Sequence, residues 1–174
     1  MNHKRRHKIL LALLIVSVCI FQSVGQPRQE QEKQSPILSI GGEVQRPLKV
    51  TPADLARLPR KTVTAKDHDG KETTFDGVEL REVLNLAGVQ FGESLRGKNL
   101  ALYLLVEAAD GYRAVFALPE LDNAFSQRVV LLADKRDGKQ LSATEGPWRL
   151  VVPDEKRQAR WVRQVTALNI RRAE

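Results

Sequence analysis

Apolar and polar residues alternate along short stretches of this chain, and turn-forming residues bound most of these stretches. Alternation with a period of two is typical of strands, because successive side chains point to opposite faces of a sheet. Residues 99–109 are apolar on both parities, which indicates a central strand buried on both faces. We predict strands over residues 36–40, 46–50, 61–66, 71–75, 99–109, 112–118, 129–133, 150–152 and 165–170.

Other segments have helical signals. Thr51 can cap a helix that has Pro52 at its first position and Asp54 near its positive end. Residues 77–86 place apolar side chains at nearly helical spacing, and Gly88 suits the position just after the end of a helix. Because strands and helices do not follow a βαβ order, the expected fold class is α+β, with a mixed or antiparallel sheet and a few short helices.

The first 25 residues differ from the rest of the chain. A basic head precedes an apolar run, residues 9–21, which is too short for a comfortable membrane span, and Ser23 and Gly25 are small. We predict that residues 1–25 are a signal peptide cleaved after Gly25. The protein would then be periplasmic or secreted, and it would meet a membrane only through this segment. An uncleaved N-terminal anchor is the alternative.

The residues after the predicted cleavage site are polar and rich in Gln and Glu. We predict a flexible linker over residues 26–36 and a single domain over residues 37–174. Cys19 is the only cysteine, so a cleaved protein has no thiol for a disulfide, a metal site or a nucleophile. Lipidation of Cys19 is an alternative, although Val18 in front of it is a poor fit for a lipoprotein signal.

Cleavage also changes the charge of the protein. The whole chain has a formal net charge of +7, from 28 Lys and Arg against 21 Asp and Glu. Residues 1–25 contain four of the cations and no acid, so the cleaved protein has a charge of +3. A nucleic-acid-binding domain is expected to be strongly basic or to contain a known motif. Neither holds here, and we expect no nucleic-acid partner.

Two groups of acidic residues are candidates for chemistry. His68 stands between Asp67 and Asp69 in a predicted turn, where a solvated hairpin tip is a better interpretation than a metal site. Glu107 and Asp110 lie at the end of a predicted strand, where ion pairing and turn formation are better interpretations than proton transfer. We therefore assign no catalytic residue and no metal ligand.

A basic stretch from Gly146 to Arg163 is the strongest candidate for binding. Guanidinium groups suit phosphate and carboxylate ligands because they donate paired hydrogen bonds. The two tryptophans can stack against a ring or an arginine. The alternative is a solvated basic edge that discourages aggregation while the tryptophans fill the core. The residues concerned are Trp148, Arg149, Lys156, Arg157, Arg160, Trp161 and Arg163.

Several segments together resemble the molybdopterin-binding domain of the sulfite oxidase superfamily. They are Gly77–Leu84, Ala109–Tyr112, Gly146–Pro153 and Arg160–Val162, in the order and approximate spacing of that family. The resemblance extends over roughly residues 37–170. It implies the mixed α+β fold of the family, in agreement with the pattern of strands and helices.

The resemblance also implies a site. Arg149 matches an arginine of the family's pterin-phosphate site, Arg160 matches a second basic residue, and Tyr112 completes the candidate anion or pterin-phosphate pocket. The family has a cysteine that ligates molybdenum, and the equivalent region, residues 63–75, contains none. Glu145 lies close to the expected phosphate, which it would repel.

Two functions therefore remain open. The first is an exported binding or accessory module without a cofactor, in which a basic edge holds a small anion or a protein partner. The second is a molybdopterin-dependent oxidoreductase, or a subunit of one. Because a thiolate both ligates and tunes the metal, its absence favours the first function.

Overall fold

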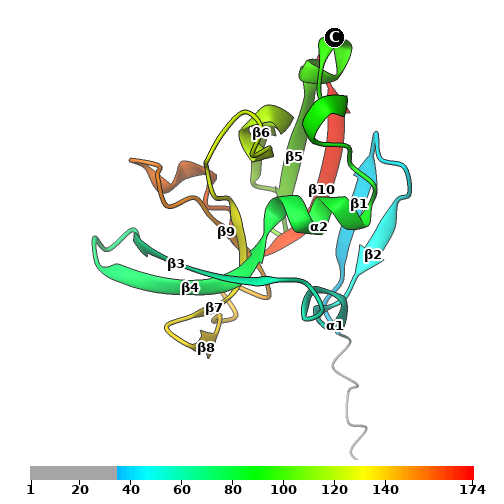
Figure 1. The fold of residues 1–174 in the computed structure, drawn as a ribbon. Coiled ribbons are helices and arrows are strands. Elements are labelled where there is room, and N and C mark those ends of the chain that lie inside the picture. Colours follow the sequence, from blue (N-terminus) through cyan, green and yellow to red (C-terminus); the bar gives the residue numbers. More distant parts are fainter. Residues whose placement is uncertain (1–34) are drawn as a thin grey trace, which may run out of the picture. The chain divides into compact units, whose positions relative to one another are not determined.

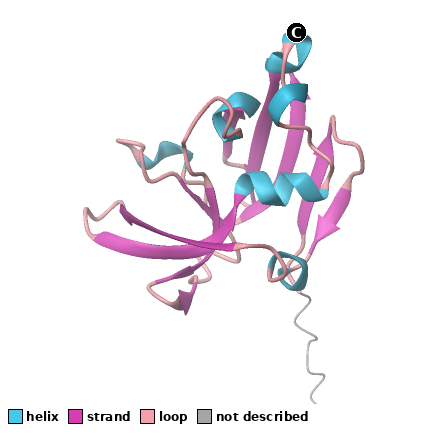
Figure 2. Ribbon diagram, in the orientation of Figure 1, coloured by secondary structure: helices cyan, strands magenta, loops and turns pink. Residues whose placement is uncertain are grey.

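A computed structural model describes residues 35–174, and these residues form two sheets with a few short helices (Figures 1 and 2). The predicted signal peptide, Cys19 and nearly all of the predicted linker lie outside the described residues, so those assignments stay predictions. The strands are β1 (Leu38–Gly42), β2 (Leu48–Val50), β3 (Arg60–Lys66), β4 (Glu72–Glu79), β5 (Leu102–Ala108), β6 (Arg113–Ala117), β7 (Leu131–Arg136), β8 (Lys139–Gln140), β9 (Arg149–Val151) and β10 (Val165–Arg172).

The first sheet has the strand order β2-β1-β10-β5-β6. Strands β1 and β10 run parallel, with Ile40 opposite Leu168, whereas the other pairs in this sheet are antiparallel. The predicted strand over residues 99–109 is β5, which lies between β10 and β6. It begins later than predicted because residues 97–101 form a short 3₁₀ helix. The sheet is therefore mixed, as the sequence pattern predicts.

The second sheet has the order β3-β4-β7-β8, and β9 also pairs with β7. All of its pairs are antiparallel. Arg149 of β9 lies opposite Ala133 of β7, and Phe75 of β4 lies opposite Arg136 of β7. The hairpin of β3 and β4 extends away from the first sheet and ends in the turn that contains Asp67 (Figure 1). This arrangement brings the turn and β9 into the same part of the domain.

The helical elements are short. They are α1 (Pro52–Leu55), α2 (Leu80–Leu86), η1 (Gly92–Ser94), η2 (Gly97–Ala101), η3 (Leu118–Leu121) and η4 (Gln158–Arg160), where η denotes a 3₁₀ helix. The predicted start of α1 is confirmed, because Thr51 and Asp54 cap each other through side-chain and backbone hydrogen bonds.

The predicted helix over residues 77–86 begins three residues later than expected. Gly77–Glu79 belong to β4, where Gly77 and Val78 lie opposite Ala133 and Leu132 of β7. A Cβ atom on Gly77 would lie 2.2 Å from the carbonyl oxygen of Leu132, so the two strands approach closely there because residue 77 is a glycine. Strand pairing therefore overrides the helical spacing of the apolar residues in this segment.

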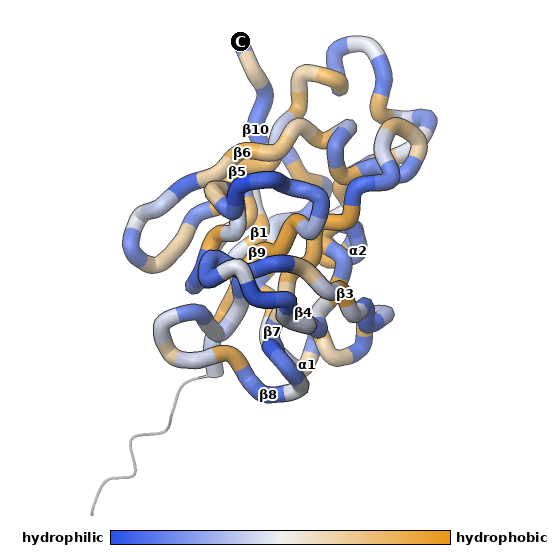
Figure 3. Tube along the Cα trace, turned by 90° about the vertical axis from the view of Figure 1, so that its left-hand side faces the viewer, coloured by the Kyte–Doolittle hydropathy of each residue, from blue (hydrophilic) through white to orange (hydrophobic). Residues whose placement is uncertain are grey.

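The core is one cluster of buried apolar side chains between the two sheets and α2. Hydrophobic stretches run through the middle of the molecule, and many of the outer turns are hydrophilic (Figure 3). Trp148, Phe75 and Phe116 are among its largest fully or almost fully buried side chains. Burial of such side chains contributes about 25 cal/mol per Å² of apolar surface, so this cluster is the main source of stability. Within residues 35–174, no helix is long and apolar enough to cross a membrane.

Candidate functional site

Arg149 begins β9 and is completely buried, with 0% of its surface exposed. A buried charge is costly unless it is paired and hydrogen-bonded. The carboxylates of Asp67 and Glu145 provide that pairing. Arg149 Nη2 donates to Asp67 Oδ1 at 3.0 Å, and Nη1 donates to Asp67 Oδ2 at 3.3 Å and to Glu145 Oε1. The guanidinium is therefore bound by two internal acids.

A second arginine closes the same cluster. Arg136 Nη1 lies 3.0 Å from Asp67 Oδ2 and 3.3 Å from Glu145 Oε1. Two guanidinium groups therefore face two carboxylates, and their formal charges cancel. We call Asp67, Arg136, Glu145 and Arg149 the Arg149 cluster. Its members come from the β3–β4 turn, β7, β9 and the loop before β9.

Aromatic rings flank the buried guanidinium. The Cζ atom of Arg149 lies 5.0 Å from the ring centroid of Phe75 and 5.5 Å from that of Trp161, and the two rings meet edge to face at 5.8 Å. Such contacts with a desolvated cation are favourable. Arg149 Nε has no acceptor among residues 35–174. An external ligand would have to displace the rings or the carboxylates to reach this group.

The cluster shifts the ionisation of Asp67. Burial alone raises the pKa of a carboxyl, but hydrogen bonds from Arg149 and from the backbone N–H of His68, together with the charges of Arg149 and Arg136, outweigh burial. The pKa of Asp67 therefore lies below its ordinary value. Asp67 is ionised at neutral pH and balances the buried guanidinium.

The prediction of a solvated hairpin tip is therefore wrong for Asp67. This residue is 5% exposed, whereas His68 and Asp69 are exposed as predicted. Asp67 is buried because the β3–β4 hairpin turns it toward Arg149, which lies 82 residues further along the chain. The sequence also does not identify Arg136 as a partner. A signal for Glu145 does exist, since it is four residues before Arg149.

Arg160, the second predicted site residue, lies at the end of η4 and belongs to a different cluster. Its guanidinium contacts Glu155 and Glu120 and donates to the carbonyl oxygen of Val115 at 3.1 Å. Its Cζ atom lies 4.3 Å from the centroid of Phe116. The side chain of Arg160 is 28% exposed. It therefore keeps partial contact with water, which Arg149 does not have.

The Arg160 cluster, which consists of Glu120, Arg128, Asp154, Glu155 and Arg160, pairs two guanidinium groups with three carboxylates. Arg128 bridges Glu120 at 2.6 Å and Asp154 at 2.9 Å. Burial opposes ionisation of Glu120, but the hydrogen bond from Arg160, the backbone N–H of Ala117 and the charges of Arg160 and Arg128 lower its pKa. The pKa of Arg160 is raised, because Glu120 and Glu155 outweigh its desolvation.

Tyr112, the third predicted site residue, contacts the segment that contains Arg160. None of its hydrogen bonds to residues 35–174 involves Arg149. Its hydroxyl donates to the carbonyl oxygen of Ala159 at 2.7 Å, and its surface is 50% exposed. Arg149 and Arg160 share no carboxylate partner in the described residues. The three predicted residues therefore do not form one site. Arg149 belongs to a buried ion-pair cluster, Arg160 belongs to a partly exposed one, and the ring of Tyr112 is half exposed.

The other acidic pair has structural contacts. Glu107 Oε1 lies 2.9 Å from Arg113 Nε, and Glu107 Oε2 accepts a hydrogen bond from Asn169 at 2.7 Å. Asp110 Oδ1 accepts from the backbone N–H of Tyr112 at 2.9 Å and shapes the β5–β6 turn. These contacts confirm the predicted ion pair and turn. Residues 35–174 contain no group of three or more His, Cys, Asp or Glu side chains arranged to hold a metal ion.

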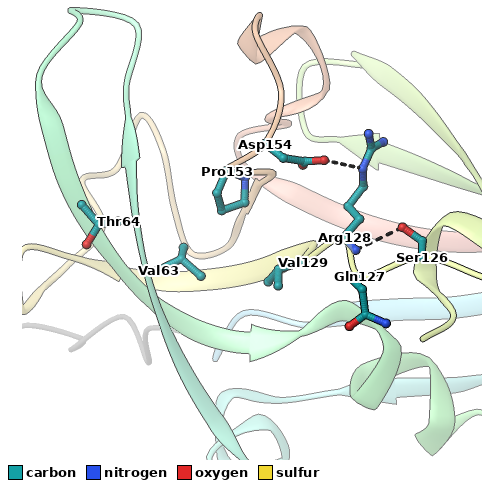
Figure 4. A pocket seen from close by; sticks show the side chains of 8 residues that line it. All are labelled: Val63, Thr64, Ser126, Gln127, Arg128, Val129, Pro153 and Asp154. Carbon is teal, nitrogen blue, oxygen red and sulfur yellow. Dashed lines mark hydrogen bonds and ion pairs between the residues drawn. The ribbon is translucent and has the colours of Figure 1, made fainter. Parts of the chain in front are cut away.

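A pocket of about 650 Å³ lies beside β3 (Figure 4). Val63 and Thr64 of β3 line one side, and Arg128, Val129 and Pro153 line the other. Its volume is in the range of small-molecule sites. However, its only cation, Arg128, is held by Asp154 and Glu120, so the pocket offers no free charge to an anion.

Comparison with protein families gives one match over most of the chain. Residues 25–174 match the family described as "Oxidoreductase molybdopterin binding domain". The matched region contains the whole part of the chain that the structure describes. No curated protein sequence matches the chain.

Comparison with solved structures gives a similar fold. The crystal structure of the sulfane dehydrogenase SoxCD from Paracoccus pantotrophus superimposes with a TM-score of 0.61 and 26% sequence identity. The alignment covers 78% of this chain and 38% of the SoxCD chain. The chain therefore spans well under half the length of that protein.

Proposed function

Because the chain belongs to the family of oxidoreductase molybdopterin-binding domains and has the sulfite oxidase-like fold, we propose that it is an exported binding or accessory module that works without the cofactor. The family binds molybdopterin, and this chain retains the two arginines that the sequence resemblance assigns to the pterin phosphate. In this chain, each of them is held by carboxylates of the protein itself.

The observation that carries the proposal is the closed Arg149 cluster. A phosphate needs a guanidinium that is accessible and not already neutralised. Arg149 has no exposed surface, and Asp67 and Glu145 take the places that ligand oxygens would occupy. Displacing them would leave two carboxylates beside a phosphate in a poorly solvated site, which is strongly unfavourable. The residues present therefore do not fit a pterin phosphate at Arg149.

The sequence supports the same proposal for the metal. The resemblance predicts a cysteine ligand within residues 63–75, and this region has none. The sole cysteine, Cys19, precedes the matched region of the family. A thiolate ligand tunes the metal as well as holding it, so oxo transfer of the usual kind lacks a protein ligand here.

One observation favours the second candidate function, a molybdopterin-dependent oxidoreductase or a subunit of one. The family match extends over 150 residues, from 25 to 174. Such a protein would hold its cofactor without cysteine and would need to open the Arg149 cluster. The activity of SoxCD is that of a longer protein, and the present chain covers 38% of it.

Metal and pterin analysis of the full chain, purified from a host that makes and inserts molybdopterin, tests the proposal. We expect less than about 0.1 molybdenum and 0.1 pterin per chain, while a known molybdopterin enzyme from the same host serves as the loading control. Stoichiometric molybdenum in the wild-type protein would overturn the proposal.

A matched variant tests the role of the acids. Asp67→Asn with Glu145→Gln keeps the hydrogen-bonding shape but removes the two negative charges that neutralise Arg149. In a thermal-shift assay with phosphate, we expect the midpoint of this double variant to rise with phosphate concentration more than that of the wild type. Equal shifts would show that the two acids do not block an anion site.

A further inference from the structure

A second pocket, of about 240 Å³, is formed by three turns that are distant in sequence. The β3–β4 turn contributes His68, the β5–β6 turn contributes Asp110 and Tyr112, and the segment around η4 contributes Trp161 and Arg163. This pocket is separate from the one beside β3, because the two share no lining residue. Its lining includes an acidic side chain, a basic side chain and two aromatic side chains.

Arg163 and Asp110 line this pocket without pairing with each other. Neither side chain forms an ion pair with any residue between 35 and 174, and both are exposed. The arginines of the two clusters described above are, by contrast, all paired with carboxylates. One oxygen of Asp110 accepts from the backbone of Tyr112, and its second oxygen remains available to a ligand. The pocket therefore presents a positive and a negative group to the same space.

Aromatic side chains complete the pocket. Tyr112 is 50% exposed, and its hydroxyl donates to the carbonyl oxygen of Ala159 at 2.7 Å, which restrains the ring. Trp161 is 3% exposed, and its indole N–H donates to the carbonyl oxygen of Val152. Gln158 is held by Lys66 through its amide nitrogen, which leaves its amide oxygen as an acceptor. Each aromatic side chain is therefore anchored by a hydrogen bond before a ligand binds, which lowers the entropic cost of binding.

We propose that this pocket binds a small zwitterion of the α-amino acid type, with its carboxylate at Arg163 and its ammonium group at Asp110. A guanidinium donates paired hydrogen bonds to a carboxylate, and a carboxylate accepts from an ammonium group. The Tyr112 ring offers a face to the cationic end and to the apolar part of the ligand. A simple anion would use Arg163 but would be repelled by Asp110.

The size of the pocket limits the ligand. Drug-sized molecules occupy pockets of roughly 300–1,000 Å³, so a pocket of about 240 Å³ suits a smaller molecule. A single amino acid with a short or medium apolar side chain meets this limit. A peptide would extend beyond the pocket, and an inorganic ion would leave the aromatic surface unused.

This inference rests on the proposed function, since it names the ligand class of a module that works without molybdopterin. It does not depend on the Arg149 cluster being able to open. Arg163 and Asp110 are exposed, so their substitution leaves the core intact. Loss of ligand binding can therefore be separated from loss of folding.

Isothermal titration calorimetry of the full chain with three matched probes tests the inference. L-leucine has both charged ends, 4-methylpentanoate lacks the ammonium group, and isoamylamine lacks the carboxylate. We expect L-leucine to bind at least about tenfold more tightly than either of the other two, because each charged hydrogen-bonded end contributes about that factor. Equal affinity for all three, or no binding of L-leucine, would overturn the inference.

Variants locate the site. Arg163→Met and Asp110→Asn are each expected to weaken L-leucine binding by about tenfold, and Asp110→Asn keeps an oxygen to accept from Tyr112. Arg157→Met is the matched control, because Arg157 is exposed and does not line the pocket. An equal loss in Arg157→Met would overturn the assignment. Failure of L-leucine to bind a protein free of molybdenum would reject this inference alone, whereas stoichiometric molybdenum would reject the proposed function.

Discussion

The Arg149 and Arg160 clusters use similar groups in different surroundings. Each places a guanidinium over an aromatic ring and pairs it with two carboxylates. Arg149 has 0% of its side chain exposed, and Arg160 has 28%. If an ion pair of Arg160 is removed, water can solvate the remaining charged group. Water cannot reach the groups around Arg149 in the same way. We therefore expect burial, rather than the number of ion pairs, to decide how much each cluster contributes to the free energy of unfolding.

The largest expected effect comes from removing the guanidinium of Arg149, and Arg160 provides the comparison. Arg149→Met leaves the buried Asp67 and the partly buried Glu145 with only Arg136 to balance them, and we expect the free energy of unfolding to fall by about 3–5 kcal/mol. Arg160→Met removes a partly exposed pair and is expected to cost about 1 kcal/mol. Urea denaturation at neutral pH measures both values.

A milder variant guards against failure of Arg149→Met to fold. Arg149→Lys keeps the charge but cannot bind two carboxylates through a planar fork, so we expect a loss between those of the two methionine variants. Similar losses for the Arg149 and Arg160 variants would remove the difference that we attribute to burial.

An intermediate effect is expected from the acid that neutralises Arg149. Because the pKa of Asp67 is lower in the folded protein than in the unfolded chain, its contribution to stability is complete above the ordinary carboxyl pKa of about 4. This contribution is lost as the pH falls through the lower pKa of the folded state. Asp67→Asn should therefore lower the free energy of unfolding by about 1–3 kcal/mol at pH 7 and by progressively less below about pH 4.

Unfolding of both proteins by urea from about pH 7 to about pH 2 measures this convergence. Asp69→Asn is the matched control, since Asp69 lies in the same turn but is exposed. A constant difference between wild type and Asp67→Asn across this range would contradict the lowered pKa of Asp67.

The smallest expected effect is a difference in salt dependence. Double-mutant cycles for Arg160 with Glu120 and for Arg149 with Asp67 isolate the coupling energy of each pair. Raising NaCl from about 0.05 to about 0.5 M should reduce the Arg160–Glu120 coupling by a few tenths of a kcal/mol, because salt screens partly exposed charges. The Arg149–Asp67 coupling should change less. The opposite order would show that solvent reaches the Arg149 cluster.

Much of the fold could be predicted because local patterns control it. The alternation in residues 165–170 predicts β10, and Thr51 with Asp54 predicts the start of α1. Residues 77–79 could not be placed correctly, because close packing of Gly77 against β7 decides that they form a strand. The spacing of apolar residues along the chain does not show that two strands will pack this closely.

The sequence by itself determined the family resemblance, the mixed α+β class and the basic residues worth testing. It also places Glu145 beside Arg149 along the chain. Only the tertiary structure decided that Arg149 is buried and that Asp67, 82 residues away, neutralises it. The physical reason is that a strand or helix follows from interactions between neighbours, whereas the partner of a buried charge depends on how distant segments pack.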